Sequence, residues 1–342
     1  MATLPNRPIG QDMETGSPAL IDALRSVADP TGGDIVSRGR VAPPRAAGGT
    51  VTLVVDVTGL APALHEPLER DIRAAAAGIP DIGELRVVLT AGKVERRIIA
   101  VGSGKGGVGK STVAANIAVA LARAGRRVGL VDADIYGPSQ PRIMGNDEKP
   151  EAIGRQLVPL VAHGVRMLSI GQLVQADSAL AWRGPMASNA LAQLIDADWG
   201  DAELLVVDLP PGTGDVQLSL MQKWKPAGAL IVSTPQDLAL IDAARAIDLF
   251  RKMDVPILGL VENMAGYACP HCGGISDPFG SGGGEAAAAA MGIAFIGRIP
   301  LKPAIRSASD GGTPPASGTG EDAAIFSDLA GKLIERLNDL PR

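Results

Sequence analysis

Apolar residues recur along most of this chain in two alternating patterns. Short, nearly continuous apolar runs, typical of strands buried on both faces, occupy residues 97–102, 127–134, 204–208, 229–233, 257–261 and 295–299. Two longer segments, 111–124 and 238–253, instead place apolar residues at helical spacing. Strands that alternate with helices predict an α/β fold with a doubly wound, mostly parallel sheet over residues 97–340.

The stretch before this sheet has a separate pattern. Helices are expected over residues 19–27 and 66–77, and strands over 49–58 and 83–89. These elements predict a small α+β domain at residues 18–91. Residues 1–17 are polar and contain several Pro and Gly residues, which predicts a disordered N-terminus.

The composition limits the partners of the chain. Of its 342 residues, 46% are hydrophobic, which is enough for one large core and one small core. The net charge of −5 argues against a nucleic-acid partner, because an acidic surface repels a phosphate polyanion. No N-terminal signal segment and no apolar stretch approaching about 18 residues is visible, so we expect a cytoplasmic protein without a membrane partner.

The octapeptide GKGGVGKS at residues 104–111 fits the phosphate-loop pattern G-x-x-x-x-G-K-[ST]. Its four glycines let the backbone curl so that several amide groups point at one phosphate. Lys110 supplies a positive charge for the β- and γ-phosphates, and Ser111 supplies a hydroxyl ligand for Mg²⁺. The loop joins a predicted strand to a predicted helix, as a nucleoside triphosphate site requires.

A second motif overlaps the same residues. Gly102, Gly104 and Gly107 spell the dinucleotide-binding pattern G-x-G-x-x-G. That pattern is common, and it gives no reason for the lysine and serine that follow. The nearest acidic residues, Asp132 and Asp134, lie farther along the chain than a ribose-binding carboxylate, so we favour a nucleoside triphosphate.

Acidic residues follow two of the predicted strands. Asp132 and Asp134 end one run, while Asp208 ends another and leads to Asp215. Ligands bind at the carboxyl ends of parallel strands. We therefore expect Asp208 to bind Mg²⁺ through a water, Asp132 to lie close to the metal and Asp134 to position the attacking water. For Asp132 and Asp215, a role in capping the following turn stays open.

The only two cysteines of the chain form one C-x-x-C motif, Cys269 and Cys272. A disulfide framework is excluded, and a sparse cysteine pair points to a reducing compartment. Zinc and iron–sulfur clusters usually take four ligands, so the pair lacks two. His271 is poorly placed to complete the same site. A symmetric homodimer, in which two such pairs meet across the two-fold axis, supplies the missing ligands.

The same motif also occurs in thiol oxidoreductases, where it lies at the start of a helix that lowers the thiol pKa. Here glycines follow the cysteines, and the sequence continues into GSGGGE at residues 280–285. We expect a glycine-rich loop in which no helix starts. An iron–sulfur cluster is therefore favoured over structural zinc and over redox catalysis.

Several motifs together resemble the Mrp/ApbC family of ATP-dependent iron–sulfur cluster carrier proteins. They are GKGGVGKS (104–111), DADIYGPS (132–139), WRGPM (182–186), DLPPGTGD (208–215), STPQD (233–237), ENM (262–264), CPHCG (269–273) and FGSGGGE (279–285). The resemblance covers about residues 97–312. The leading module, with DPTGGDIVSRGRV at 29–41, is similar to the small iron–sulfur-assembly-associated domain of many bacterial members, but it has no cysteine.

The resemblance implies an ATPase with a deviant P-loop, in which two subunits enclose two nucleotides. Lys105 would reach the phosphates of the other subunit, with Lys110 and Asp134 as the further catalytic residues. Asn263 matches the position that recognises adenine. The nucleotide-binding residues would be Gly104, Lys105, Gly106, Gly107, Val108, Gly109, Lys110, Ser111, Thr112 and Asn263.

The resemblance also implies a cargo. A 4Fe-4S cluster, shared by Cys269 and Cys272 of both chains, would be delivered to apo-proteins, with cluster scaffold proteins as further partners. ATP and Mg²⁺ would be the other cofactors.

Partition and division ATPases, which share the deviant loop but bind membrane or nucleoid, are the main alternative. Such proteins typically need a basic amphipathic tail or a basic surface. Residues 323–337 do place Ile325, Leu329, Leu333 and Leu337 at helical spacing. Their charged neighbours are of both signs, so we expect this helix to pack against the sheet. Residues 182–186 and 235–237 fit a client contact and a dimer face equally well.

Overall fold

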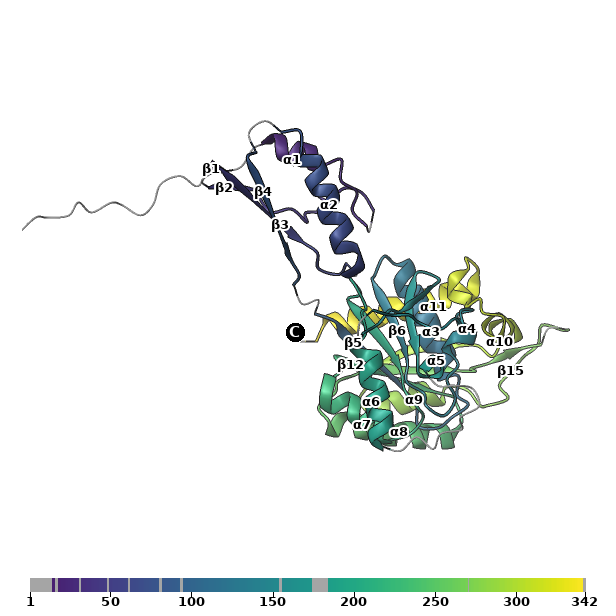
Figure 1. Ribbon diagram of the computed structural model, residues 1–342. Coiled ribbons are helices and arrows are strands. Elements are labelled where there is room, and N and C mark those ends of the chain that lie inside the picture. The colour runs from purple at the N-terminus through teal and green to yellow at the C-terminus, as the bar shows by residue number, and fades with distance from the viewer. Residues whose placement is uncertain are drawn as a thin grey trace, which may run out of the picture. The chain divides into compact units, whose positions relative to one another are not determined.

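The computed structural model describes residues 14–15, 18–30, 32–47, 49–60, 62–79, 82–92, 95–153, 156–173, 184–269 and 271–340. Its contacts divide the chain into two compact units, Met1–Val94 and Glu95–Arg342 (Figure 1). Of residues 1–17, predicted to be disordered, only Glu14 and Thr15 lie within the described residues, and they form the short strand β1 (Glu14–Thr15).

The smaller unit is a four-stranded sheet with helices packed on it. Its strands follow the order β1, β2 (Arg45–Ala47), β3 (Thr50–Asp56) and β4 (Glu84–Thr90). The pair β3–β4 is parallel, and the crossover between them contains a 3₁₀ turn (Pro62–Leu64) and α2 (His65–Ala76). Alternate residues of β3 are buried, and they share one core with α1 (Pro18–Leu24) and α2.

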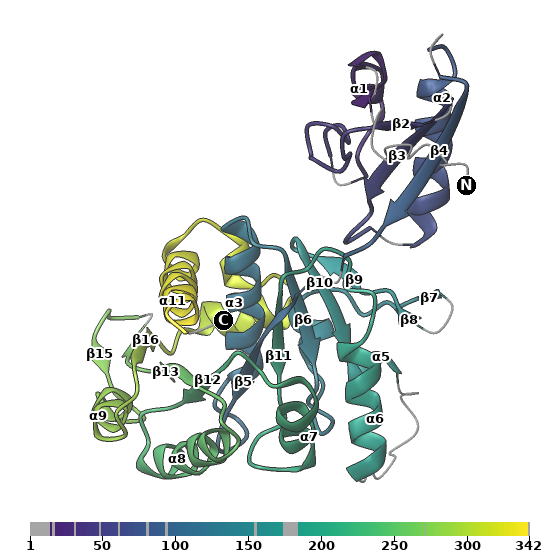
Figure 2. The ribbon, with the colours of Figure 1, turned by 90° about the vertical axis from the view of Figure 1, so that its left-hand side faces the viewer.

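The larger unit contains the eight-stranded sheet on which the site is built (Figure 2). In spatial order the strands are β16 (Phe295–Ile299), β13 (Ile257–Asn263), β12 (Gly228–Ser233), β5 (Arg97–Gly102), β11 (Leu204–Asp208), β6 (Val128–Asp132), β10 (Val165–Ser169) and β9 (Leu160–Ala162). Only the edge pair β9–β10 is antiparallel. The predicted doubly wound, mostly parallel sheet is confirmed.

Helices cover both faces of this sheet, which explains the continuous apolar runs. Ile99 and Val101 of β5 face α3 (Lys110–Arg123) and α11 (Glu321–Asn338). Ile98 and Ala100, the alternate residues, face the opposite core, which α6 (Gly184–Ile195), α7 (Asp215–Trp224) and α8 (Asp237–Lys252) complete. A strand with a core on each side has no polar face.

Shorter elements connect the main ones. They are α4 (Gln140–Ile143), α5 (Ile170–Leu173), α10 (Pro303–Asp310), a 3₁₀ turn (Pro315–Ser317), and the hairpins β7 (Ala152–Ile153)–β8 (Gln156–Leu157) and β14 (Tyr267–Ala268)–β15 (Ile275–Ser276). Among the helices in the described part of the chain, none is long and apolar enough to cross a membrane.

The glycine-rich segment after the cysteines corrects one expectation. A helix does start there, because α9 (Gly283–Ala290) begins within GSGGGE. The amide of Gly284 donates a hydrogen bond to the buried carboxylate of Glu262, and a Cβ at Gly284 would lie 2.7 Å from Glu262 Oε2. The glycines therefore let the helix start close to β13, whereas the sequence pattern had suggested a loop.

The predicted C-terminal helix packs as its spacing indicates. Phe326, Leu329 and Leu333 of α11 are buried in the core that contains α3.

We expect Phe326→Ala to lower the free energy of unfolding of the larger unit by about 3–5 kcal/mol, because it leaves a cavity in this core. Chemical denaturation, followed by circular dichroism, measures the change. Asp328→Ala, which removes an exposed pair with Lys332 on the same helix, is the matched control and should cost less than about 1 kcal/mol. Equal losses for the two variants would contradict the packing described here.

Candidate functional site

The phosphate loop connects β5 to α3, as its motif requires. Gly107 and Gly109 both adopt φ +81°, a left-handed conformation that favours glycine. Gly104 is constrained differently, because a Cβ there would collide with the backbone of Asp242 in α8. The loop amides and the start of α3 therefore lie together at the carboxyl edge of the sheet, where an anion binds favourably.

Lys110, the first residue of α3, is buried between two carboxylates. Its Nζ donates a hydrogen bond to Asp208 at the end of β11 and lies 3.5 Å from Asp134 Oδ2. Ser111 Oγ is 3.4 Å from the same Nζ. The structure therefore brings Lys110, Ser111, Asp134 and Asp208 together, as predicted. Hydroxyl and carboxylate oxygens are ligands that suit Mg²⁺.

Asp132 lies in the same region but is fully buried. Its Oδ2 accepts hydrogen bonds from the amides of Ser139 and Gln140, both at 3.0 Å, and from Ser169 Oγ at 2.8 Å. Burial, together with the neighbouring charge of Asp208, raises the pKa of Asp132 to about 7. These contacts make Asp132 an anchor for the segment after β6. Asp208 is buried to the same extent, but one of its oxygens is paired with the side chain of Lys110, which itself lines the cleft.

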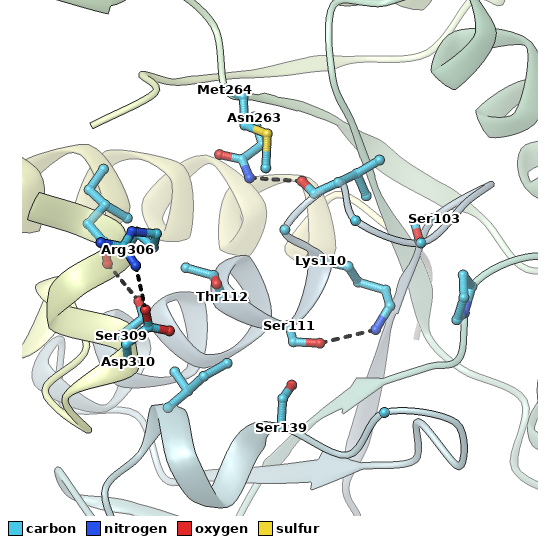
Figure 3. A pocket seen from close by; sticks show the side chains of 18 of the residues that line it. Ser103, Lys110, Ser111, Thr112, Ser139, Asn263, Met264, Arg306, Ser309 and Asp310 are labelled. Atoms are coloured by element: carbon cyan, nitrogen blue, oxygen red, sulfur yellow. Dashed lines mark hydrogen bonds and ion pairs between the residues drawn. The ribbon is translucent and has the colours of Figure 1, made fainter. Parts of the chain in front are cut away.

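A cleft of about 440 Å³ opens in front of the loop (Figure 3). The predicted residues that line it are Lys105, Gly106, Gly107, Val108, Gly109, Lys110, Ser111, Thr112, Asp134 and Asn263. Gly104, Asp132 and Asp208 are not among the lining residues. Three cations that sequence reasoning missed also line the cleft, Arg142, Lys302 and Arg306. They come from segments without a recognisable motif, and only the fold brings them to the loop.

Asn263 and Lys105 contact parts of their own chain. The amide nitrogen of Asn263 donates to the carbonyl of Val108 at 2.8 Å, so the predicted adenine-binding residue touches the phosphate loop (Figure 3). Lys105 Nζ donates to Gln236 Oε1 at 3.2 Å. Gln236 is the residue before α8, within the STPQD motif. Asp215 is exposed in the first turn of α7 and does not line the cleft.

The two cysteines lie at the tip of the β14–β15 hairpin, which projects from the larger unit (Figure 1). The Cys269 amide donates to the Gly274 carbonyl, and the Gly273 amide donates to the Cys269 carbonyl, both at 2.9 Å. Hydrogen bonds from the amides of His271 and Cys272 lower the pKa of the Cys269 thiol. Cys272 is exposed.

In the described part of the chain, the cysteine pair has no further metal ligand nearby. Within the described residues, no group of three His, Cys, Asp or Glu side chains is close enough together to hold a metal ion.

The segment that leads into this hairpin, its first root, is anchored beside the cleft. It follows Asn263 by way of Met264, which has a left-handed φ of +60°. Two backbone hydrogen bonds of 2.9 Å then join the root to the end of β16 and the residues after it. The Ala265 amide donates to the Ile299 carbonyl, and the Leu301 amide donates to the Gly266 carbonyl.

The second root returns through α9. A Cβ at Gly283 would lie 2.6 Å from the Pro235 carbonyl, so the two backbones are in close contact. Pro235 precedes Gln236, the partner of Lys105. The first root therefore follows a residue that contacts the phosphate loop, and the second root packs against a segment that contacts it.

Comparison with known proteins agrees with this arrangement. The family model described as "NUBPL iron-transfer P-loop NTPase" matches residues 94–334, and the "Iron-sulfur cluster assembly protein" model matches residues 18–87. An "Iron-sulfur cluster carrier protein" of Deinococcus radiodurans is 42% identical, over 94% of this chain and 97% of the relative. The chain belongs to the iron–sulfur cluster carrier family of P-loop NTPases.

Other relatives of this carrier family come from different organisms. The Arabidopsis thaliana "Iron-sulfur protein required for NADH dehydrogenase, mitochondrial" is 50% identical over 71% of this chain and 79% of the relative. The carrier protein of Escherichia coli K12 is 47% identical over 71% of this chain and 67% of the relative.

Solved structures share the fold of the larger unit. A nucleotide-binding protein from Archaeoglobus fulgidus, in complex with ADP, has a TM-score of 0.56 and 39% identity, covering 63% of this chain and 86% of that one. The cell division ATPase MinD of Pyrococcus furiosus has a TM-score of 0.54 and 25% identity, covering 70% of this chain and 98% of that one. The carrier family and the division ATPases therefore share one fold, and the fold alone does not separate their functions.

We expect Gly109→Ala to weaken nucleotide binding by at least about tenfold more than Gly107→Ala. Both residues have the same φ, so both variants carry a similar backbone strain of about 1–2 kcal/mol. Only at position 109 would the new Cβ also collide with the amide of Asn263, whereas nothing lies within 4 Å at position 107. Titration with a fluorescent ADP analogue measures both affinities. Similar affinities would show that the contact between Asn263 and the loop does not matter for binding.

Proposed function

We propose that the protein hydrolyses ATP, holds a 4Fe-4S cluster between two copies of itself and transfers that cluster to apo-proteins. The observation that carries this proposal is the pairing of two sites on one chain. A phosphate loop with its acidic partners lies at the base of a hairpin whose two thiols have no further ligand among the described residues. Family membership supports the carrier function.

The cleft would hold ATP with Mg²⁺. The loop amides and Lys110 would bind the phosphates, while Ser111 and Asp208 would hold Mg²⁺ directly or through water. Mg²⁺, when bound, neutralises charge on the phosphates. Asp134 lines the cleft beside Lys110 and would orient the attacking water. The ADP complex of the Archaeoglobus fulgidus protein supports nucleotide binding by this fold.

Asp132 would act indirectly in this scheme. Both of its oxygens already accept hydrogen bonds from the segment after β6, Oδ1 from the Asp134 amide and Oδ2 from the Ser139 and Gln140 amides. We therefore assign it to holding that segment in place rather than to binding Mg²⁺.

A second copy of the chain would cover the face beside the loop. Leu238 and Ile241 of α8 are 73% and 53% exposed, which is unusual for large apolar side chains on a helix that otherwise packs into the core. Lys105 lies next to this helix through Gln236. In the dimer, Lys105 would leave Gln236 and bind the phosphates of the partner's nucleotide.

The cluster would be the cargo rather than a resident cofactor. Two hairpins supply four thiolates, the usual ligand number of a 4Fe-4S cluster. The exposed position of Cys272 suits a ligand that must be exchanged during handover. Cluster scaffold proteins would supply the cluster, and apo-proteins that need one would receive it.

Metal analysis after anaerobic reconstitution tests the cluster. We expect about four iron and four sulfide per dimer with a visible charge-transfer band, both lost in Cys269→Ala/Cys272→Ala. His271→Ala, between the two cysteines, is the control and should retain the cluster. Stoichiometric zinc without sulfide would contradict the proposal and make the site a structural clamp.

Phosphate release tests the ATPase. Lys110→Ala should lower kcat by about 100-fold or more, because the charge that stabilises the phosphates in the transition state is lost. Lys332→Ala, on the exposed face of α11, should leave the rate unchanged. Normal hydrolysis by Lys110→Ala would place ATP hydrolysis elsewhere or exclude it.

A further inference from the structure

Gln140 is fully buried and contacts two parts of the proposed Mg²⁺ site. It is the first residue of α4, and its Nε2 lies 2.9 Å from Asp208 Oδ2 and 3.0 Å from the Ser111 carbonyl oxygen. Both neighbours are acceptors, so the atom between them is the amide nitrogen rather than the oxygen. The two N–H groups of this nitrogen each have a partner.

The backbone of Gln140 is fixed as firmly as its side chain. Its amide N–H donates to Asp132 Oδ2 at 3.0 Å. Asp132 therefore holds the residue, and the residue holds Asp208. Because Lys110 takes the other oxygen of Asp208, the orientation of that carboxylate is set by Gln140 and Lys110 together.

The amide oxygen of Gln140 has a different environment. It is buried, and among the residues that the structure describes no group donates a hydrogen bond to it. A buried carbonyl oxygen without a donor is costly and calls for an explanation. The oxygen is bonded to the same carbon atom as Nε2, which contacts Ser111 and Asp208, although Gln140 itself does not line the cleft. Mg²⁺ bound at Ser111 and Asp208 would keep several waters, and each water carries donors.

We propose that Gln140 is a positioning residue for Mg²⁺. Its amide nitrogen fixes Asp208, and its amide oxygen accepts a hydrogen bond from a water on the metal. This inference rests on the proposed function, since it needs a nucleotide with Mg²⁺ in the cleft. It implies that Gln140 raises the affinity for the Mg²⁺–nucleotide complex but contributes little to the affinity for the nucleotide alone.

The test compares ADP binding with and without the metal. Dissociation constants of a fluorescent ADP analogue are measured in Mg²⁺ and in EDTA. The constant in EDTA divided by the constant in Mg²⁺ reports the contribution of the metal. We expect Gln140→Met, which keeps the side-chain volume, and Gln140→Leu to reduce this ratio at least tenfold, while the constant in EDTA changes less than threefold. The melting temperature without ligand shows that each variant is folded.

Gln172→Leu is the matched control. The side-chain amide of Gln172 also makes two hydrogen bonds. Its oxygen accepts one from the backbone N–H of Ser169, and its nitrogen donates one to the Glu148 carbonyl, but it does not touch Asp208. The ratio of the dissociation constants in EDTA and in Mg²⁺ should be the same for Gln172→Leu as for the wild type.

Three results would overturn the inference in distinguishable ways. An unchanged ratio in folded Gln140→Met would show that the residue does not act on the metal. Equal weakening in Mg²⁺ and in EDTA would assign Gln140 a structural role alone. If wild-type protein itself showed no effect of Mg²⁺, the proposed nucleotide function would fail together with the inference.

Discussion

The buried ammonium of Lys110, held between Asp208 and Asp134, is the interaction around which the larger unit is arranged. A buried charge costs several kcal/mol unless it is paired. The pairing depends on the strand order, because β11 lies between β5 and β6 and Asp208 is in register with Val101 and Asp132. Parallel strands in this order end at one edge, so the carboxylates are next to the loop that carries the lysine.

This arrangement suits a site that binds a phosphate and a cation together. A phosphate would replace the carboxylates as the partner of Lys110, and Mg²⁺ would replace the ammonium as the partner of Asp208. Each buried charge would then keep a counter-charge, which limits the cost of switching between the two states. Gln140 would keep Asp208 in one orientation throughout the exchange.

The cysteine hairpin is connected to the phosphate loop at both of its roots. One of its roots follows Asn263, which contacts the phosphate loop, and the other packs against Pro235, beside the partner of Lys105. A nucleotide that displaced Lys105 from Gln236 would therefore act on a segment in direct contact with the start of α9, the helix that follows the hairpin. In the proposed function, these two short chains of contact would give ATP binding a physical route to the thiols.

The sequence predicted those parts of the structure that depend on local pattern. The bounds of β5, β11 and β16 match their predicted ranges, because strands buried on both faces read as unbroken apolar runs. The edge strand β9 and the glycine start of α9 were missed, since their positions depend on tertiary contacts such as that of Gly284 with Glu262.

The site also combines features that depend on local sequence with features that depend on tertiary contacts. GKGGVGKS is a local motif, whereas Lys110 and Asp208 are 98 positions apart and meet only through the strand order. Gln140 has no sequence signal, and only the structure shows that Asp132 faces inward while Asp134 lines the cleft.

Transfer of a cluster to a recipient tests the central claim most directly. Reconstituted protein is mixed with the apo form of a 4Fe-4S enzyme in the presence of Mg²⁺, ATP and an iron chelator, and the recovered activity of that enzyme is followed. We predict recovery with wild-type protein and none with Cys269→Ala/Cys272→Ala. Equal recovery with both proteins, or no recovery with either, would contradict a carrier that delivers its cluster through this cysteine pair.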